Sequence, residues 1–398
     1  MPDNKSTSTA SQHSPEKVLR VLWSLNRGGA EVRAVDVVRN LDPDRVRVDF
    51  VALSGKPSEM DEMVRGLGSQ IHYLPLTKSF PIQFWNLLKQ EKPVCVHCQL
   101  TLFSGFIMLL AWLARIPQRV TSYHNMYGTA REKLSGKLYA SLMRWLVRSC
   151  ATDIVAVSEA TLDHCYGNQW RKDSRCQIVY QGFPQNNPSR EQVRQVRQEL
   201  GLQNGPVIVN VGNFRTVKNQ IRALEIFSEL LEREPNAHFL IAGGTHGYEE
   251  SEINFAAFQE EVARKQLTGH VHLLGPRHDV NVLLAAADLM LFTSITEGCA
   301  NVIWEAIAQG TPVLTSELPI VDELSRYMSG VTQCSLQDEN NTWVEAAGKI
   351  LARSGNEILR QKLRNEFEAG PLNVQQTCLN YEKIWTGRIP APALKRAA

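Results

Sequence analysis

Two glutamates lie in a segment whose pattern is typical of a strand–loop–helix unit that binds a polar ligand. Residues 289–316 read as an apolar strand, a polar loop, a helix, and a second strand that follows Gly-Thr-Pro. Glu297 falls in the loop, and Glu305 falls in the helix on the same face as Asn301. The carboxylates could accept hydrogen bonds from different hydroxyls of one ligand, and the helix start between them offers free N–H groups to an anion such as phosphate. Taken alone, such a pair is expected by chance in a chain of this length.

Two cations follow another predicted strand. The strand at 207–213 ends in a loop that carries Arg215, and Lys218 falls at the start of the next predicted helix. An arginine could bind a diphosphate through two hydrogen bonds, and a lysine could supply a second positive charge. The alternative is that both side chains are simply solvated.

Paired glycines and a histidine end three further predicted strands. Gly28-Gly29 and Gly243-Gly244 would let the backbone approach a ligand closely, although each pair could also form an ordinary tight turn. His124 ends an alternating strand, where the pattern is equally compatible with a structural and a catalytic histidine.

The elements that must position these residues form two α/β series. Apolar strands alternate with helices through residues 17–185 and again through 206–372, which predicts two doubly wound domains with parallel sheets. Residues 186–205 are polar and predict a linker with a surface helix, and residues 373–390 predict a final helix. Residues 1–16 are polar and predict a disordered tail. Because ligands bind at the carboxyl ends of parallel strands, the candidate residues are expected to line one cleft between the domains.

Composition excludes several classes of protein. With 43% hydrophobic residues, 21% charged residues and a net charge of +2, the chain fits a soluble globular protein and not a nucleic-acid binder. The apolar run 103–114 is too short to span a bilayer and predicts a buried helix. The only close cysteine pair, Cys95 and Cys98, falls in a predicted strand where the two thiols face opposite ways, so no metal site is predicted. The thiols fit a reducing cytoplasm.

The motifs described above resemble those of the GT-B glycosyltransferases of family 4, which are retaining enzymes that use nucleotide-diphosphate sugars. In chain order they are RGGAE, YHN, VGNFRTVKN, AGG and EGCANVIWEAIAQGTPV. The resemblance extends from about residue 17 to residue 385 and is most specific in the last motif. It implies two Rossmann-like domains facing across a cleft, with an N-terminal acceptor domain, a C-terminal donor domain, and a final helix that crosses back onto the first domain.

The resemblance also implies roles for individual residues. Glu297 would hold hydroxyls of the donor sugar, Lys218 would neutralise the leaving phosphate, and His124 would lie beside the sugar. Glu305 would hold the ribose hydroxyls of the nucleotide. The other donor-binding positions are Gly28, Gly29, Arg215, Gly243, Gly244, Gly298, Asn301 and Val302.

The chain departs from the family pattern at two places. Asn213 stands where the family usually has an arginine, so Arg215 would have to reach the same phosphate. Cys299 and Ala300 replace an aromatic–proline pair, which predicts a donor pocket of different shape.

The expected reaction needs neither a metal nor a cofactor. Cations and helix N–H groups can stabilise the charge that develops on a departing diphosphate. A glycoside hydrolase is disfavoured, because Glu297 and Glu305 lie too far apart along one helix start to flank a scissile bond. Two alternatives stay open, a sugar-nucleotide epimerase on the same fold and a non-catalytic subunit that binds a sugar nucleotide.

The acceptor is expected to be a hydroxyl of a lipid-linked or glycan intermediate of exopolysaccharide, capsule or lipopolysaccharide. The predicted helix 131–149 combines large apolar side chains with basic ones, a profile that fits an interfacial helix on anionic lipid. Its basic residues are Arg131, Lys133, Lys137, Arg144 and Arg148. A core-packed helix with a solvated basic face is the alternative. The protein is therefore expected in the cytoplasm, in peripheral contact with the inner face of the membrane if the first interpretation holds.

Overall fold

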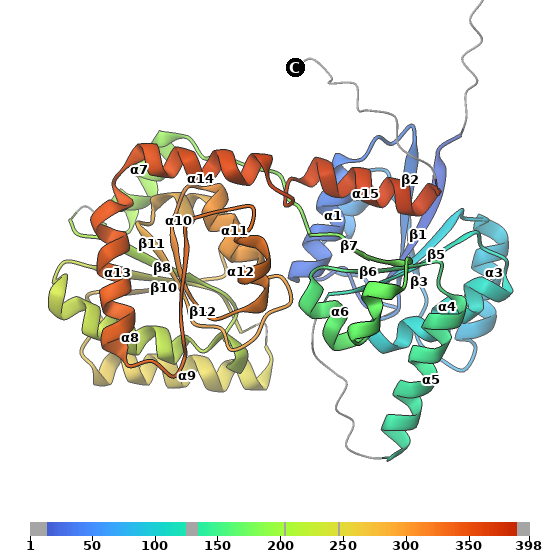
Figure 1. Ribbon diagram of the computed structural model, residues 1–398, viewed down its shortest axis with the longest axis horizontal. Coiled ribbons are helices and arrows are strands. Elements are labelled where there is room, and N and C mark those ends of the chain that lie inside the picture. The colour runs from blue at the N-terminus through green and yellow to red at the C-terminus, as the bar shows by residue number, and fades with distance from the viewer. Residues whose placement is uncertain (1–13, 125–133, 203, 246, 388–398) are drawn as a thin grey trace, which may run out of the picture.

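The computed structural model describes residues 14–124, 134–202, 204–245 and 247–387, which form two α/β units side by side (Figure 1). Most of the predicted tail, residues 1–13, lies outside the described residues, and the first strand already begins at Glu16. The predicted class, two doubly wound parallel sheets, is confirmed.

The first unit is built on seven parallel strands in the order β3-β2-β1-β4-β5-β6-β7. The strands are β1 Glu16–Leu22, β2 Val46–Ala52, β3 Ile71–Tyr73, β4 Cys95–Cys98, β5 Gln118–Tyr123, β6 Asp153–Ala156 and β7 Cys176–Ile178. The helices are α1 Gly29–Asn40, α2 Asp61–Gly66, α3 Phe80–Glu91, α4 Ser104–Leu113, α5 Leu134–Cys150 and α6 Glu159–Cys165. Hydrophobic cores lie on both faces of the sheet, which explains why apolar side chains of its inner strands point to either face.

The second unit is built on six parallel strands in the order β10-β9-β8-β11-β12-β13. The strands are β8 Val207–Val211, β9 His238–Ala242, β10 Val271–Gly275, β11 Leu289–Phe292, β12 Val313–Ser316 and β13 Val331–Cys334. The helices are α7 Arg190–Glu199, α8 Gln220–Arg233, α9 Glu249–Arg264, α10 Val280–Ala286, α11 Asn301–Ala308, α12 Pro319–Leu324, α13 Asn340–Ser354 and α14 Glu357–Ala369. Strand β13 is absent from the sequence prediction, because an edge strand needs no continuous apolar run and its side chains are mostly half-buried or exposed.

Two helices lie outside the strand–helix rhythm, and the second of them joins the units. Helix α7, within the predicted linker, begins with a capping box formed by Ser189 and Gln192 and packs on α10. The last helix, α15 (Val374–Thr386), continues the line of α14 and lies over the first unit (Figure 1). It contacts α1, β4 and β5, and it buries Tyr381 and Trp385 in the core of the first unit.

Strand order determines where a site can form. The order reverses between β1 and β4 in the first sheet and between β8 and β11 in the second. Helices that leave such neighbouring strands on opposite faces open a crevice at the carboxyl ends of the strands. The loops after β1, β5, β8 and β11, which carry the candidate residues, therefore belong to these two edges.

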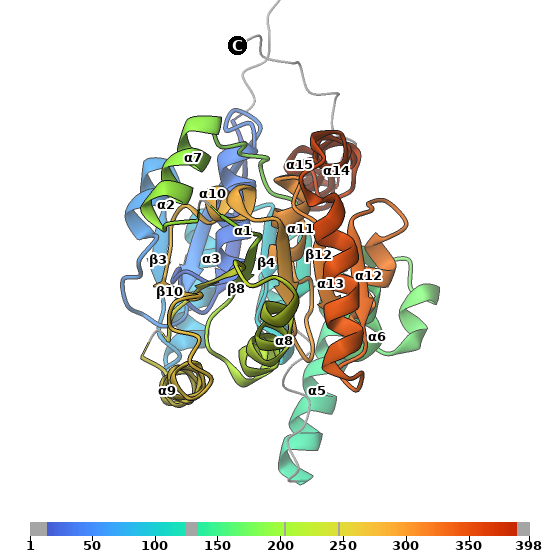
Figure 2. The same ribbon diagram turned by 90° about the vertical axis from the view of Figure 1, so that its left-hand side faces the viewer.

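Helix α5 extends away from the body of the first unit in both views (Figure 1, Figure 2). One side of it packs on α4, where Gly105 lets the backbones approach so closely that an added Cβ would lie 2.4 Å from the carbonyl oxygen of Met143. Among the described residues, no helix is long and apolar enough to cross a membrane.

Candidate functional site

In the second unit, the predicted cation and the predicted loop carboxylate lie together. Lys218 ends a short 3-10 turn after β8, and the left-handed backbone of Asn219 (φ 50°) starts α8 behind it. The ammonium group of Lys218 donates to Glu297 Oε1 at 2.6 Å and lies 5.1 Å from the centre of the Phe292 ring. Both side chains of the pair are largely buried, with exposed fractions of 22% and 15%. A negative group of a ligand would meet this ammonium at the carboxyl edge of the sheet.

Asn213 and the Gly243-Gly244 pair hold neighbouring loops together. The side-chain oxygen of Asn213 accepts a hydrogen bond from Gly244 N–H at 3.2 Å. Gly243 must be a glycine, because an added Cβ would lie 2.0 Å from the carbonyl oxygen of Gly212. Arg215 is exposed. Loop packing is thus sufficient to explain these glycines, and a contact of theirs or of Arg215 with a donor stays a prediction.

The loop before α11 is shaped by Ala300, which adopts a left-handed conformation with φ 49°. Cys299 and Ala300 are both buried, and the Cys299 carbonyl accepts from the Trp304 indole at 3.0 Å. Burial raises the pKa of the Cys299 thiol to about 12, so this thiol stays protonated. The carbonyl of Gly298 accepts from Ser158 of the first unit at 3.1 Å. Cys299 and Ala300, which replace the aromatic–proline pair, are therefore the buried part of this loop.

The second carboxylate pairs with a residue that sequence reasoning missed. Glu305 on α11 accepts a hydrogen bond from the guanidinium of Arg33 on α1, so this ion pair joins the two units. Arg33 also donates to Asp36 at 2.8 Å and lies 4.4 Å from the centre of the Phe183 ring. The sequence could have indicated Arg33, because this residue follows Gly29 by four positions and therefore lies on the same face of α1 as the glycine turn.

A cavity of about 350 Å³ separates α1 from the loops that end β7 and β10. Its lining carries four arginines and two carboxylates, one of which is Glu305. The charged side chains and histidine that line it are Arg27, Arg33, Asp36, Arg39, Arg277, His278 and Glu305. Ligand pockets are concave and carry a few convergent polar groups, and this one has the size and the charge for an anionic ligand such as a nucleotide.

His124 is buried and bonded through both ring nitrogens. Its Nε2 lies 2.8 Å from Ser122 Oγ, and its Nδ1 lies 2.5 Å from the side-chain amide of Gln181. Burial and the nearby charge of Arg20 lower the pKa of His124 to about 3, so its ring is neutral at pH 7. Gln181, which follows β7, reaches the Asn301 amide at 3.4 Å. Sequence reasoning also missed Gln181, although its place after a strand end in the first sheet could have marked it.

The Gly28-Gly29 turn faces the start of α11. An added Cβ on Gly29 would lie 3.5 Å from the Asn301 side-chain amide. The structure thus brings the first glycine turn, His124 and Asn301 to one place, with Gln181 between the last two. Their contacts with a substrate remain predictions.

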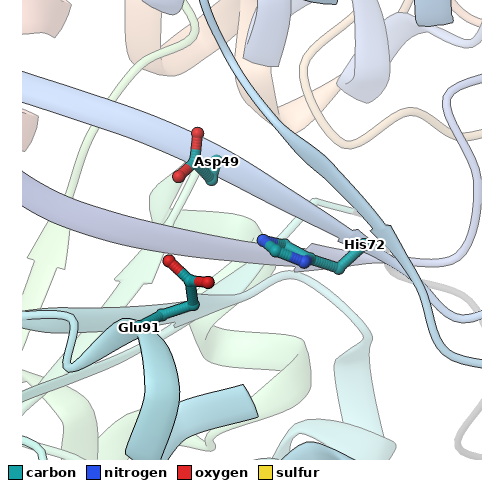
Figure 3. A group of neighbouring side chains, drawn as sticks. All are labelled: Asp49, His72 and Glu91. Atoms are coloured by element: carbon teal, nitrogen blue, oxygen red, sulfur yellow. The ribbon is translucent and has the colours of Figure 1, made fainter.

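Among the described residues, one group of side chains has the composition of a metal site. Asp49 on β2, His72 on β3 and the end of α3 at Glu91 point toward one another, with their ligand atoms within 4.8 Å (Figure 3). However, Asp49 already accepts from Arg47 at 3.2 Å, and Glu91 accepts from Lys17 at 2.5 Å. The two cations balance both carboxylates, so we assign no metal to this group.

One further carboxylate pair has the spacing of a metal-binding DxD motif. Asp42 and Asp44 lie in the turn between α1 and β2, where Asp42 accepts from the Asp44 N–H at 3.1 Å. This turn is at the amino end of β2, the edge of the sheet opposite the site.

Helix α5 buries one side and exposes the other, and contact of the exposed side with a membrane stays a prediction. Its inner side buries Met143 and Val147 against α4. Its outer side exposes Leu138, Leu142 and Trp145, with exposed fractions of 65%, 51% and 60%. Lys137 and Arg148 are also exposed, Arg144 is half-buried, and Arg131 and Lys133 lie outside the described residues.

Both halves of the chain match known sequence families. Residues 27–186 match Glycosyltransferase Family 4, and residues 192–366 match Glycosyl transferases group 1. The putative glycosyltransferase EpsF of Bacillus subtilis is 28% identical over 88% of this chain and 92% of its own length. The capsular polysaccharide biosynthesis glycosyltransferase CapH of Staphylococcus aureus is 24% identical over 85% of this chain and 91% of its own length.

An Escherichia coli relative and a solved structure add chemical detail about similar proteins. The relative, named UDP-Gal:alpha-D-GlcNAc-diphosphoundecaprenol alpha-1,3-galactosyltransferase, is 24% identical over 77% of this chain and 81% of its own. HepE of Anabaena, solved in complex with UDP, superimposes with a TM-score of 0.78 at 17% identity and covers 94% of this chain and 100% of its own. At this identity the likeness establishes the fold.

Proposed function

Because the chain belongs to the GT-B glycosyltransferases of family 4, group 1, we propose that it is a retaining, metal-independent enzyme of surface-polysaccharide biosynthesis. It would move a sugar from a nucleotide-diphosphate donor to a hydroxyl of a lipid-linked or glycan acceptor. The observation that carries the proposal is the Lys218–Glu297 pair at the edge where the two units meet. The names of relatives that act in capsule assembly and on a diphosphoundecaprenol acceptor support the choice of pathway and acceptor class.

The donor would lie across α11 with its diphosphate at the helix start. The backbone N–H groups of Asn301 and Val302 belong to the first turn of α11, where helix N–H groups lack partners within the helix and favour an anion. Glu305, farther along the same helix and on the wall of the basic cavity, would accept the ribose hydroxyls. The cavity would therefore receive the nucleoside.

Lys218 and Glu297 would act at the other end of the donor. Glu297 would accept hydrogen bonds from sugar hydroxyls, and Lys218 would leave that carboxylate in part to bind the phosphate oxygen that departs. A cation that is already held near the leaving oxygen stabilises the charge that forms in the transition state.

The bond changes can be written without an enzymic base. The bond from the anomeric carbon to the phosphate oxygen breaks, and a bond to the acceptor oxygen forms on the same face of the sugar. The acceptor proton passes to the departing phosphate, which leaves as nucleoside diphosphate. His124 is neutral at pH 7 and occupied through both ring nitrogens, so this scheme asks no proton transfer of it.

The donor can be identified first and the reaction second. We expect one of the UDP-, GDP- or ADP-sugars to raise the unfolding temperature, because a ligand of the folded state stabilises it. Incubation of that donor with extracted polyprenyl-diphosphate acceptors in EDTA should then give a product with the anomeric configuration of the donor. Donor turnover without an acceptor would indicate an epimerase. Binding without turnover in all conditions would indicate a non-catalytic subunit.

The membrane part of the proposal rests on α5. Three exposed apolar side chains on its outer side lie beside exposed basic ones, and no acidic residue occurs between 134 and 150. Such a surface binds anionic lipid through apolar burial and charge together. We expect the protein to pellet with anionic vesicles at low salt, and the double change Leu138→Ser and Trp145→Ser to abolish this.

A matched control is Ile358→Ser on α14, which removes a side chain that is 82% exposed elsewhere on the molecule. If the wild-type protein stays in the supernatant, or if the control loses as much binding as the α5 variant, the membrane role of α5 is wrong.

A further inference from the structure

A continuous line of hydrogen-bonded side chains runs from the last helix through the first sheet to the start of α11. It begins on α15, crosses β4 and β5, continues in the loop after β7, and ends in the second unit. In order, its members are Trp385, His97, Ser122, His124, Gln181 and Asn301.

The first member determines the direction of the whole line. The indole of Trp385 lies 3.1 Å from His97 Nδ1, and an indole N–H can only donate. His97 Nδ1 must therefore accept. Burial and the charge of Arg20 keep the pKa of His97 well below its ordinary value, so the neutral ring carries its single proton on Nε2. That proton points to Ser122 Oγ at 2.9 Å.

The same reasoning fixes the tautomer of His124. Since Ser122 Oγ accepts from His97, its own proton is free to donate to His124 Nε2 at 2.8 Å. His124 is neutral for the same reason as His97, because it is buried near Arg20. In the opposite tautomer Ser122 Oγ would accept from both histidines, and among its described contacts its own proton would have no acceptor. We therefore place the His124 proton on Nδ1, facing Gln181.

The amide of Gln181 has only one orientation that completes the line. In the structure its Nε2 lies at His124 Nδ1 and its Oε1 accepts from Asn301 Nδ2. With the amide turned by 180°, its oxygen faces His124 Nδ1–H and its NH₂ group faces Asn301. The orientation of an amide is assigned from its hydrogen-bond network. Turning the Asn301 amide as well lets its oxygen, which is otherwise buried without a partner, accept from Gln181, and it places the Asn301 NH₂ group where the oxygen now lies.

We propose that this line positions the donor site: Trp385, His97 and Ser122 fix His124 as the Nδ1–H tautomer, and His124 holds Asn301 through Gln181. Apart from Asn301, the residues of the line are positioning residues, and none of them exchanges a proton with substrate. The inference rests on the proposed function only in that Asn301 must belong to the donor site. It also gives α15 a role, because Trp385 on this helix supplies the N–H group that determines the direction of the hydrogen bonds along the line.

The tautomer can be measured without any activity. In the full-length protein labelled with ¹⁵N, long-range ¹H–¹⁵N spectra at pH 7 report which ring nitrogen carries the proton. The signal absent from His124→Gln identifies His124 among the ten histidines. We expect a protonated Nδ1 and an unprotonated Nε2, and a mixture of tautomers in Trp385→Phe, which keeps an aromatic ring, although a smaller one, and loses the N–H. A wild-type His124 protonated on Nε2, or on both nitrogens, would overturn the proposal.

Donor kinetics test whether the line matters for binding. Trp385→Phe and Gln181→Leu should raise the KM for the donor by about threefold to tenfold, as expected for one lost hydrogen bond, with kcat within about twofold. Gln181→Glu is the discriminating variant, because a carboxylate can accept from His124 but cannot donate to Asn301. It should keep the Nδ1–H tautomer and still show the raised KM.

Trp343→Phe is the matched control, since Trp343 is also fully buried and its indole donates to Ser335 O at 3.0 Å, outside the line. It should lower the unfolding temperature and leave the KM unchanged. Equal effects of Trp385→Phe and Trp343→Phe on the KM would overturn the positioning role. If the wild-type protein transfers no sugar, the proposed function fails, whereas the tautomer and the affinity for nucleoside diphosphate still decide this inference.

Discussion

The two carboxylates of the candidate site are paired in different ways. Glu297 is held by Lys218 within the second unit, whereas Glu305 is held by Arg33 across the boundary between the units. The first pair would survive if the units moved apart, and the second would not. The Lys218–Glu297 pair is therefore assembled within one domain, whereas the Arg33–Glu305 pair forms only when the first unit is in place.

The two pairs also differ in what a donor would do to them. Lys218 can turn from Glu297 to a phosphate oxygen, so a donor would add a partner to this pair. Arg33 occupies the carboxylate that the ribose hydroxyls would need, so a donor would have to replace it. Arg33 keeps Asp36 as a second partner and is therefore not left unpaired.

Removal of Lys218 should have the largest effect of the four changes predicted here. In Lys218→Ala the leaving phosphate loses a cation that is already in position, and we expect kcat to fall about 100-fold to 1000-fold, with a smaller change in nucleotide affinity. Steady-state transfer assays would measure this. Lys349→Ala, at an exposed lysine of α13, should behave as wild type. A kcat for Lys218→Ala within twofold of wild type would remove Lys218 from the site.

Removal of Glu305 should act on binding and not on chemistry. Glu305→Ala loses hydrogen bonds between a carboxylate and the ribose, so the affinity for nucleoside diphosphate should fall about 10-fold to 100-fold in calorimetric titration. Glu232→Ala, an exposed glutamate of α8, is the control. Unchanged affinity in Glu305→Ala would show that the nucleoside binds elsewhere.

The buried side chain of His124 should make the stability of the protein depend on pH in a way that the ion pairs do not. His124 has a pKa of about 3 when folded against an ordinary value of 6.5, so between these values the unfolded chain binds a proton that the folded protein does not. Its contribution therefore lowers stability as the pH falls below 6.5, by at most about 1.4 kcal/mol per pH unit. Denaturant unfolding at pH 5 and pH 7 should show a smaller pH dependence in His124→Gln than in wild type. An equal dependence in both would contradict the low pKa.

The smallest predicted effect is the one that best distinguishes the Arg33–Glu305 pair from the Lys218–Glu297 pair. A double-mutant cycle on Arg33 and Glu305 should give a coupling of about 1 kcal/mol in the free protein, as expected for a partly exposed pair. Saturating nucleoside diphosphate should abolish that coupling, because the ribose takes the carboxylate. Arg197 and Asp288, paired at 2.9 Å, form the control cycle, which the nucleotide should not alter. Persistent Arg33–Glu305 coupling in the bound protein would show that the ribose does not replace Arg33.

Much of this protein could be predicted from its sequence alone. Alternating apolar strands and helices predict both doubly wound sheets, because burial on two faces requires continuous apolar strands and the period of a helix is a local property. The spacing of Glu297 and Glu305 around a helix start is likewise local, and it predicts their places on either side of that start. Edge strand β13 was not predicted, because it is not buried on both sides and so lacks a continuous apolar run.

Only the tertiary structure decided which residues are partners. Arg33 and Glu305 are 272 positions apart, and Trp385 and His97 are 288 positions apart. No periodicity or propensity connects such positions, since their contact depends on how two independently wound sheets and a crossing helix pack. The sequence determined the two halves and the chemistry that each presents. Packing determined that the first unit supplies the arginine that pairs with Glu305, and that a line of hydrogen-bonded side chains from α15 and the first unit reaches Asn301.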